Sequence, residues 1–246
     1  LARLRRSAEA IGLDIPIPES HWPELLHEAM RRNGVGNEQT DAYLRITVSR
    51  GAGEIGLDPG LCPRATVVIM AKPLHPSPPV LSRDGVSLTV ANTRRNLPEA
   101  LSPQIKSTNF LNNILAKRES IAAGTFDSLF LNWKDELTEC TVSNLFFISG
   151  KTLHTPALDC GILDGITRTI VMTLAQEEGV PVREGHYHLA DLQRAEECFL
   201  TNTSMEIMPV NRVDSFAIGD GRPGSLTRRL QTRFADSRTR FLEPPS

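Results

Sequence analysis

A proline-rich segment about one third of the way along the chain limits what this sequence can fold into. Residues 72–85 read KPLHPSPPVLSRDG and contain four prolines. Because proline lacks a backbone N–H and has a fixed φ, such a run fits neither a helix interior nor a central strand. The segment therefore predicts a linker at residues 77–84 between a small domain, residues 1–76, and a larger domain, residues 85–246.

Helix and strand patterns mix on both sides of this linker. Before it, residues 1–36 are expected to be helical with a break at 15–18, and strands are expected at 42–48 and 65–70. Because the two kinds of element do not alternate strictly, the pattern favours an α/β fold of the α+β type over a doubly wound sheet. After the linker, strands are expected at 86–91, 126–132, 144–148, 152–154, 198–201 and 213–218, and helices at about 107–123, 166–178 and 225–241.

Composition and charge exclude several classes of protein. The formal net charge is −2, so a nucleic-acid or acidic-membrane partner is not expected. The apolar runs are far shorter than the roughly 20 residues that a membrane helix needs. The four cysteines show no CxxC spacing and no accompanying histidine cluster, which predicts free thiols in a reducing cytoplasm and no metal site.

Lys106 is a candidate nucleophile, one of only five lysines in the chain. It lies in SPQIKSTNFLNN, just before a predicted helix with apolar residues at 110, 111, 114 and 115. This pattern predicts an amine near a core, where desolvation lowers the pKa of a lysine and makes it nucleophilic. Taken alone, the segment also fits an ordinary surface lysine.

Three further segments carry groups suited to binding an anionic, nitrogen-containing cofactor. Glu139 precedes the apolar run 145–148, and a carboxylate there could hold a ring nitrogen protonated or merely cap a strand. A helix expected at Ile166 could bind phosphate through its free N–H groups. The turn TNTS at 201–204 offers hydroxyls, although such turns often cap helices for stability only.

Together these segments resemble a known family. IKSTNFLNNILAKRES, LTECTVSNLFFI, GILDGITR and TNTSMEIMPV resemble, in this order and spacing, the fold-type IV (class IV) pyridoxal-5′-phosphate enzymes. That family includes branched-chain aminotransferases, D-amino-acid aminotransferases and aminodeoxychorismate lyases. The resemblance covers nearly the whole chain. It implies a two-domain fold with pyridoxal 5′-phosphate at the domain interface, and a homodimer.

The resemblance also implies a role for particular residues. Lys106 would form the Schiff base and act as general acid and base, and Glu139 would pair with the pyridine nitrogen. The opening LARL resembles the helix whose arginine contacts the phosphate, and the family's preceding strands are absent, so we expect residues upstream of Leu1. The phosphate would be held by Arg3, the backbone amides of Ile166 and Thr167, and the Thr203 hydroxyl, and the Ser204 amide would lie near the substrate carboxylate.

Substrate signals divide between branches of the family. AYLR resembles the YxR strand of the branched-chain enzymes, which nominates Tyr43 and Arg45 as substrate-facing residues. Phe110, however, stands where those enzymes usually have a tyrosine, and the lysine segment aligns without gaps to the other two branches. Against the D-amino-acid branch, the loop after SRG carries Glu54, Ile55 and Leu57, where an arginine and a histidine are expected.

The expected function is ping-pong amino transfer between an amino acid and a 2-oxo acid, branched-chain-like with glutamate and 2-oxoglutarate. Aminodeoxychorismate lyase, D-amino-acid aminotransferase and a non-catalytic protein that binds pyridoxal phosphate remain alternatives.

Overall fold

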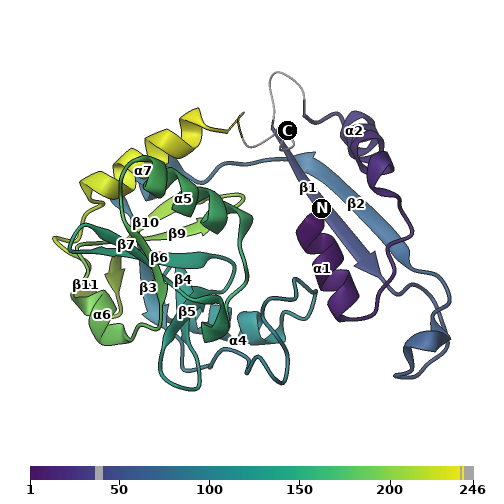
Figure 1. Cartoon of the computed structure of the whole chain (residues 1–246), viewed down its shortest axis with the longest axis horizontal. Helices are drawn as coiled ribbons and strands as arrows, with labels where there is room; N and C mark the ends of the chain where they lie inside the picture. Colours follow the sequence, from purple (N-terminus) through teal and green to yellow (C-terminus); the bar gives the residue numbers. More distant parts are fainter. Residues whose placement is uncertain (37–40, 239, 241–246) are drawn as a thin grey trace. The chain divides into compact units, whose positions relative to one another are not determined.

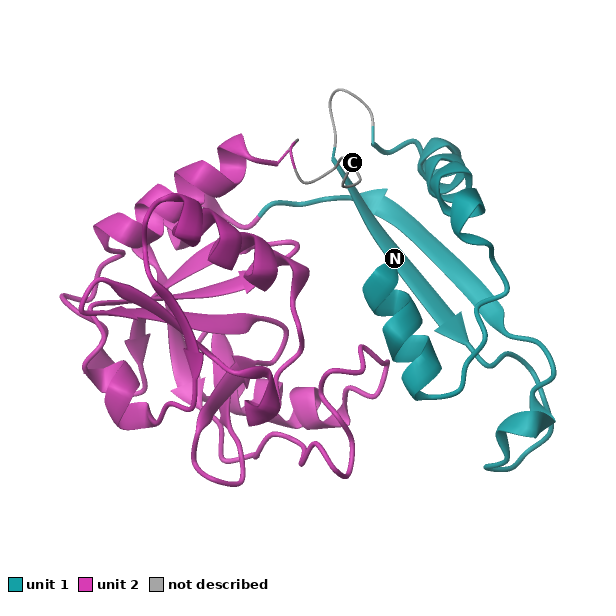
Figure 2. Cartoon of the chain, in the orientation of Figure 1, with its two compact units in different colours: residues 1–76 teal, residues 77–246 magenta. Residues whose placement is uncertain are grey.

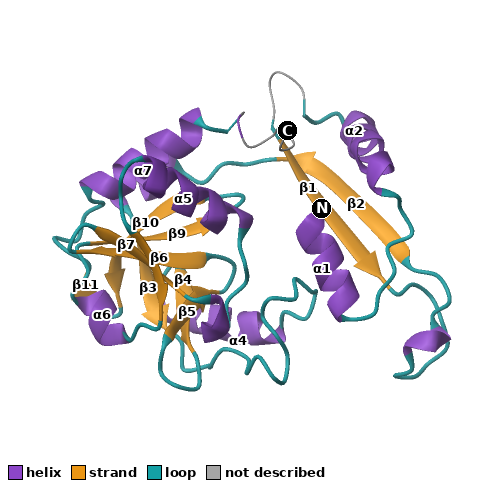
Figure 3. Cartoon of the chain, in the orientation of Figure 1, coloured by secondary structure: helices purple, strands orange, loops and turns teal. Residues whose placement is uncertain are grey.

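The computed structural model describes residues 1–36, 41–238 and 240. The chain forms two compact units, residues 1–76 and 77–246 (Figure 2). Helices and strands mix in both units, so the predicted α/β class is confirmed (Figure 3). In the part of the chain described, no helix has the length and apolar character to cross a membrane.

Unit 1 pairs two strands and packs the helix α2 against one of them, β2 (Figure 1). The strands β1 and β2 run antiparallel, in register from Ala42 opposite Pro73 to Ser49 opposite Thr66. Trp22, at the start of α2, is buried. The elements are α1 Ala2–Ala10, η1 Glu19–His21, α2 Trp22–Asn33, β1 Ala42–Ser49, η2 Pro59–Leu61 and β2 Thr66–Pro73.

The proline-rich segment contains a short helix, contrary to the prediction that it holds no helix. β2 ends at Pro73, and α3 spans Pro79–Asp84. Pro79 occupies the first helical position, where the missing N–H has no intrahelical acceptor and the fixed φ suits the helix. The prolines therefore excluded a helix interior here but not a helix start.

Unit 2 is built on a nine-stranded sheet that closes on itself. β10 pairs with β3, and the pairing continues through β4, β5, β6 and β9 back to β10. β7 and β8 extend the sheet beyond β6, and β11 extends it beyond β10. The strands are β3 Val86–Val90, β4 Asp127–Leu131, β5 Leu137–Cys140, β6 Asn144–Ser149, β7 Thr152–Pro156, β8 Val182–Gly185, β9 Glu197–Asn202, β10 Glu206–Val213 and β11 Phe216–Ala217.

Apolar side chains fill both sides of this sheet. Leu88, Leu129, Leu145 and Leu200 belong to the larger core cluster. Alternate residues such as Phe146 pack with helix residues in a second cluster, as the two-residue period of a strand requires. The helical elements of unit 2 are α3, α4 Leu111–Ala123, η3 Leu158–Cys160, α5 Ile166–Glu177, α6 Leu189–Gln193 and α7 Ser225–Asp236.

The prediction of one strand over residues 213–218 was wrong, because a turn at Asp214, with φ of 45°, separates β10 from β11. β10 was not expected, since it contains Pro209. The structure accommodates this proline because pairing with β3 begins at Val210, beyond it. The helix expected from 107 begins at Leu111, and the last helix ends at Asp236. Phe241, its expected end, lies outside the described residues.

Candidate active site

Glu139 lies at an irregularity in the pairing of β5. Leu131 pairs with Leu137 and Leu129 with Cys140, so β5 contains one residue more than β4 over this stretch. Leu137 and Cys140 therefore both join the core despite their odd spacing. An extra residue of this kind re-aims the side chains of a strand. It gives Glu139 a direction different from that of Leu137 and Cys140.

Glu139 is 5% exposed, and three donors hold its carboxylate. Arg95 Nη2 donates to Oε1 at 2.6 Å, and Asn144 Nδ2 donates to Oε2 at 3.1 Å. The backbone N–H of Leu163 donates to Oε2 at 3.0 Å. A carboxylate has about four acceptor positions. The group is therefore oriented by the protein and retains capacity for one further donor.

Burial dominates the electrostatics of this carboxylate. It raises the pKa of Glu139 to about 7, against the lowering effects of the Arg95 guanidinium, the Leu163 N–H and the Lys106 ammonium. Lys106 is thus close enough to Glu139 for its positive charge to lower the pKa of that carboxyl. A cationic ring N–H at the remaining acceptor position would favour the ionised carboxylate further.

Lys106 lies in an exposed loop, which corrects the expectation of an amine near a core. Phe110, Leu111 and Ile114 are also exposed, because α4 turns Ala116 and Ser120, not these residues, toward the sheet. Arg95 Nη1 donates to the side-chain oxygens of Asn112 and Asn113, in the first turn of α4 directly after this loop, at 3.3 and 3.4 Å. Arg95 thereby connects the lysine loop to Glu139.

Asn144 connects Glu139 to the start of α5. Its Nδ2 donates to the Leu163 carbonyl at 2.8 Å as well as to Glu139. A Cβ at Gly165 would lie 2.0 Å from Asn144 Oδ1, so only glycine permits this approach. Across the sheet, Asn144 pairs with Thr201 of β9.

The first turn of α5 has the geometry of an anion site. Gly165 is the N-cap and supplies no side-chain cap, so the amides that follow it are not satisfied by a capping side chain. Thr167 is buried, whereas Ile166 is exposed. The helix dipole favours a negative charge at this end.

The turn after β9 contains Thr203 and Ser204, the end of the TNTS segment that was predicted to offer hydroxyls. Thr203 and Ser204 are exposed. Asn202 Oδ1 accepts the N–H of Ser204 at 3.0 Å and of Met205 at 2.7 Å, so the Ser204 amide already has an acceptor.

Two hydroxyls lie at the Asn144–Thr201 pair, one on Ser143, which the sequence did not single out, and one on Thr201, which begins the predicted TNTS turn. Ser143 Oγ and Thr201 Oγ1 are buried without a hydrogen-bond partner in the described part of the chain. Buried polar atoms usually have partners, so these two suit a polar ligand. Together with Glu139 and the α5 start, they fit a group that carries both a ring nitrogen and a phosphate.

The remaining predicted residues belong to unit 1. Arg3 lies in α1, and Tyr43 and Arg45 lie in β1. Because residues two apart in a strand share a face, Tyr43 and Arg45 point to the same side. Their cross-strand partners on that face are Lys72, whose Nζ lies 5.0 Å from the Tyr43 ring centroid, and Met70.

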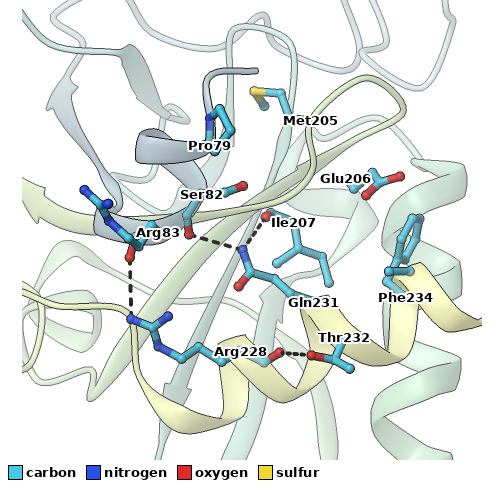
Figure 4. A pocket seen from close by; sticks show the side chains of 11 residues that line it. Pro79, Ser82, Arg83, Met205, Glu206, Ile207, Arg228, Gln231, Thr232 and Phe234 are labelled. Atoms are coloured by element: carbon cyan, nitrogen blue, oxygen red, sulfur yellow. Dashed lines mark hydrogen bonds between the residues drawn. The ribbon is translucent and has the colours of Figure 1, made fainter. Parts of the chain in front are cut away.

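Unit 2 also contains a hollow between α3, β10 and α7 (Figure 4). Gln231 Nε2 donates to the carbonyls of Ser82 and Ile207 at 3.5 and 3.1 Å, and Arg228 Nη2 donates to the Arg83 carbonyl at 3.5 Å. These bonds join α7 to its neighbours. None of the predicted site residues is among those that line the hollow.

Residues 1–213 match the family model described as amino-transferase class IV. The chain belongs to the class IV aminotransferase family. The resemblance drawn from the four sequence segments is confirmed.

Relatives of this class IV aminotransferase carry different names. It is 37% identical over 239 residues to the "Putative branched-chain-amino-acid aminotransferase" of Methanocaldococcus jannaschii, covering 97% of this chain and 81% of that one. It is 30% identical over 231 residues to the aminodeoxychorismate lyase of Bacillus subtilis, covering 94% and 76%. The solved structure of the Escherichia coli branched-chain amino acid aminotransferase has a TM-score of 0.90 at 28% identity, covering 96% and 77%.

Sequence reasoning assigned no individual role to four residues of this candidate site, namely Arg95, Ser143, Asn144 and Thr201. Arg95 is one of 22 arginines, and no local pattern distinguishes it. Asn144 lies within the segment LTECTVSNLFFI, but its role depends on Leu163 and Gly165, which approach it only in the fold.

Proposed function

We propose that this class IV aminotransferase binds pyridoxal 5′-phosphate on Lys106 and transfers an amino group between an amino acid and a 2-oxo acid. The observation that carries the proposal is the buried Glu139 carboxylate. It is oriented by Arg95, Asn144 and Leu163, lies within reach of the Lys106 charge, and has room for one more donor. When bound, the cofactor supplies an electron sink for the pair released at the substrate Cα.

The chain's own groups then divide the work. Glu139 would accept the pyridine N–H and keep that nitrogen protonated, while Arg95, hydrogen-bonded to Oε1, fixes the orientation of the carboxylate. Lys106 would hold the cofactor through its amine and would act as the general acid and base that moves the substrate Cα proton. Its position in an exposed loop gives the amine freedom to alternate between these roles.

For the phosphate, we propose the amides of Ile166 and Thr167, the Thr203 hydroxyl and the Arg3 guanidinium. The uncapped start of α5 supports the first two. Replacing Arg3 or Thr203 by alanine should weaken cofactor binding by roughly 1.5–3 kcal/mol, the value of a charge-assisted hydrogen bond. Unchanged cofactor affinity in Arg3→Ala would remove Arg3 from this set.

On the substrate side, we propose Tyr43 and Arg45, which share one face of β1. A guanidinium there suits the distal carboxylate of glutamate or 2-oxoglutarate. Arg45→Ala should raise KM for 2-oxoglutarate far more than for an aliphatic 2-oxo acid, and equal increases would contradict this role. Ser204 would reach the substrate carboxylate by sharing its N–H with Asn202.

Borohydride reduction followed by peptide mapping tests the central assignment. The pyridoxyl group should be found on Lys106. The other four lysines are internal controls, and a label on Lys72, Lys117, Lys134 or Lys151 would overturn the mechanism.

Elimination is the second candidate, because the B. subtilis relative is named aminodeoxychorismate lyase. It would use the same lysine and release pyruvate. Assays with a 2-oxo acid plus an amino donor, and separately with aminodeoxychorismate, distinguish the two reactions. A spectral titration with L- and D-amino acids then separates branched-chain-like from D-amino-acid transfer.

We also propose that the enzyme is a cytoplasmic homodimer. The exposed apolar residues Leu111, Ile114 and Ile121 of α4 support a subunit interface. The four cysteines are free, which suits a reducing compartment. Sedimentation should give twice the mass of the 27.1 kDa chain, and Ile114→Asp should shift the equilibrium toward monomer.

A further inference from the structure

Three potential metal ligands from separate segments meet beside the candidate active site. Glu136 lies just before β5, Cys160 ends η3, and His186 follows β8. Their ligand atoms all lie within 4.8 Å of one another. His186 Nδ1 lies 3.2 Å from Glu136 Oε1 and 3.5 Å from Cys160 Sγ.

These separations match the edges of a tetrahedral zinc site. With zinc bonds of about 2.0–2.1 Å to nitrogen, 2.0–2.2 Å to oxygen and 2.3 Å to sulfur, neighbouring ligand atoms are about 3.3–3.6 Å apart. The two measured edges from Nδ1 are close to these values without rearrangement. The third edge, between Glu136 and Cys160, is at most 4.8 Å.

Two of the ligands also have the outer partners typical of zinc sites. Asp159 Oδ2 lies 3.3 Å from His186 Nε2, so a carboxylate faces the ring nitrogen that would not bind metal. Asn132 Nδ2 donates to Glu136 Oε2 at 2.7 Å, leaving Oε1 directed toward His186. Such contacts fix the tautomer and orientation of the ligands.

Charge and protonation are compatible with a divalent cation. Asn132 donates to the Glu136 carboxylate and the His186 ring lies beside it, which favours the ionised carboxylate that a metal needs. Cysteine binds zinc as the thiolate and not as the thiol. Metal binding must therefore displace the thiol proton. The thiolate and the carboxylate would then neutralise the two charges of the ion.

We propose that Glu136, Cys160 and His186 bind one zinc ion, with a fourth position open to water on the side where the His186 side chain is 45% exposed. Three nitrogen, oxygen and sulfur ligands of this kind suit zinc better than magnesium or calcium. The ion would fix residues 157–165 at Cys160. The same segment holds Glu139 through Leu163 and leads into α5, so zinc would steady two parts of the candidate active site.

The cysteine pattern of the sequence predicted no metal site, because its ligands have no characteristic spacing. Glu136, Cys160 and His186 are brought together by the turn before β5, by η3 and by the end of β8. The pairing of β7 with β8 places Pro156 opposite Gly185, which brings the η3 segment and His186 together.

The experiment measures zinc on untagged holoenzyme, dialysed against metal-free buffer after loading with zinc alone. The wild type and Cys62→Ser, a matched thiol control in unit 1, should each retain one zinc per chain by mass spectrometry. Cys160→Ser and His186→Gln should weaken zinc affinity by about 100-fold or more. Asp159→Asn should weaken it by about 10–100-fold, as expected for an outer partner.

Cobalt substitution and proton release give readouts independent of activity. Cobalt should produce visible bands and a thiolate charge-transfer feature in the wild type that are lost in Cys160→Ser. Titration in buffers of different ionisation enthalpy should show release of a proton from the thiol. If Cys160→Ser fails to fold, His186→Gln and Asp159→Asn decide the question, because Asp159 has a 73% exposed side chain. A wild type without zinc, or variants that bind it equally, would overturn the proposal.

Discussion

Glu136 and Glu139 lie three residues apart on one hairpin, yet their environments shift their pKa values in opposite directions. Both are largely covered, at 8% and 5% exposure. Burial raises the pKa of Glu139 to about 7, whereas the hydrogen bonds of Glu136 outweigh its burial and lower its pKa. The exposed fraction of the residue therefore does not decide whether its carboxylate is ionised. The depth of protein around the group and the partners it meets decide it.

The two sites also differ in what holds them. Glu139 is bound to Arg95, whose side chain is as deeply buried as its own. Glu136 faces His186, which is half exposed. We therefore expect changes around Glu139 to affect stability and turnover strongly, and changes around Glu136 to have small effects unless metal is present. The four predictions below test this contrast in order of expected size.

Arg95→Met should cause the largest loss of stability. It leaves the Glu139 carboxylate buried without its cation, and breaking a buried ion pair in this way costs about 3–5 kcal/mol. Urea denaturation of the cofactor-free protein measures the effect. Arg94→Met is the matched control, because Arg94 forms an exposed ion pair with Asp135 at 2.5 Å and should contribute less than about 1 kcal/mol. Equal losses of stability in Arg95→Met and Arg94→Met would show that burial of an ion pair does not decide how much it contributes.

Glu139→Gln should preserve shape and cofactor binding but slow turnover. Without a fixed anion, the pyridine nitrogen loses its proton more readily and the substrate Cα proton is harder to remove. A loss near 3 kcal/mol corresponds to about 100-fold in rate. Single-turnover absorbance with an amino donor reports this step. A stable, cofactor-loaded variant with near-wild-type rates would contradict the role proposed for Glu139.

The raised pKa of Glu139 also predicts a pH dependence of the cofactor-free protein. Between pH 4.5, its ordinary pKa, and about 7, the native state retains a proton that the unfolded state has released. Stability from this group is therefore present below pH 4.5 and is lost as pH rises toward 7, by roughly 2–3 kcal/mol. Thermal unfolding across this range should show the decline. Glu139→Gln should flatten it, and a wild-type profile unaffected by that substitution would contradict the assignment.

Glu136→Gln should have the smallest effect in metal-free protein. Its partner His186 is half exposed, so the lost interaction should contribute about 1 kcal/mol or less. Because the pKa of Glu136 is lowered, its contribution is present above its ordinary pKa and lost as pH falls. Melting curves of the metal-free wild type and variant at a series of pH values check both points. A loss as large as that of Arg95→Met would remove the contrast between the two carboxylates.

Much of the candidate site could be found from local sequence. Glu139 was identified because a charged residue precedes an apolar strand, and the α5 start because GILDGITR ends a loop at a helix. Lys106 was identified within its segment, but its surroundings were not. Phe110 and Ile114 were expected to cover it, yet α4 turns its small residues Ala116 and Ser120 inward and leaves the large ones exposed.

By itself the sequence determined the strands 144–148 and 152–154, the helix at Ile166 and the family, since these depend on residues close together in the chain. Only the tertiary structure decided the closure of the sheet through β9 and β10, the Arg95–Glu139 pair and the meeting of Glu136, Cys160 and His186. Hydrophobic periodicity reports which face of an element is buried, but not which element lies against it. Charged and metal-binding pairs between distant segments therefore leave no local pattern and emerge only from the packing.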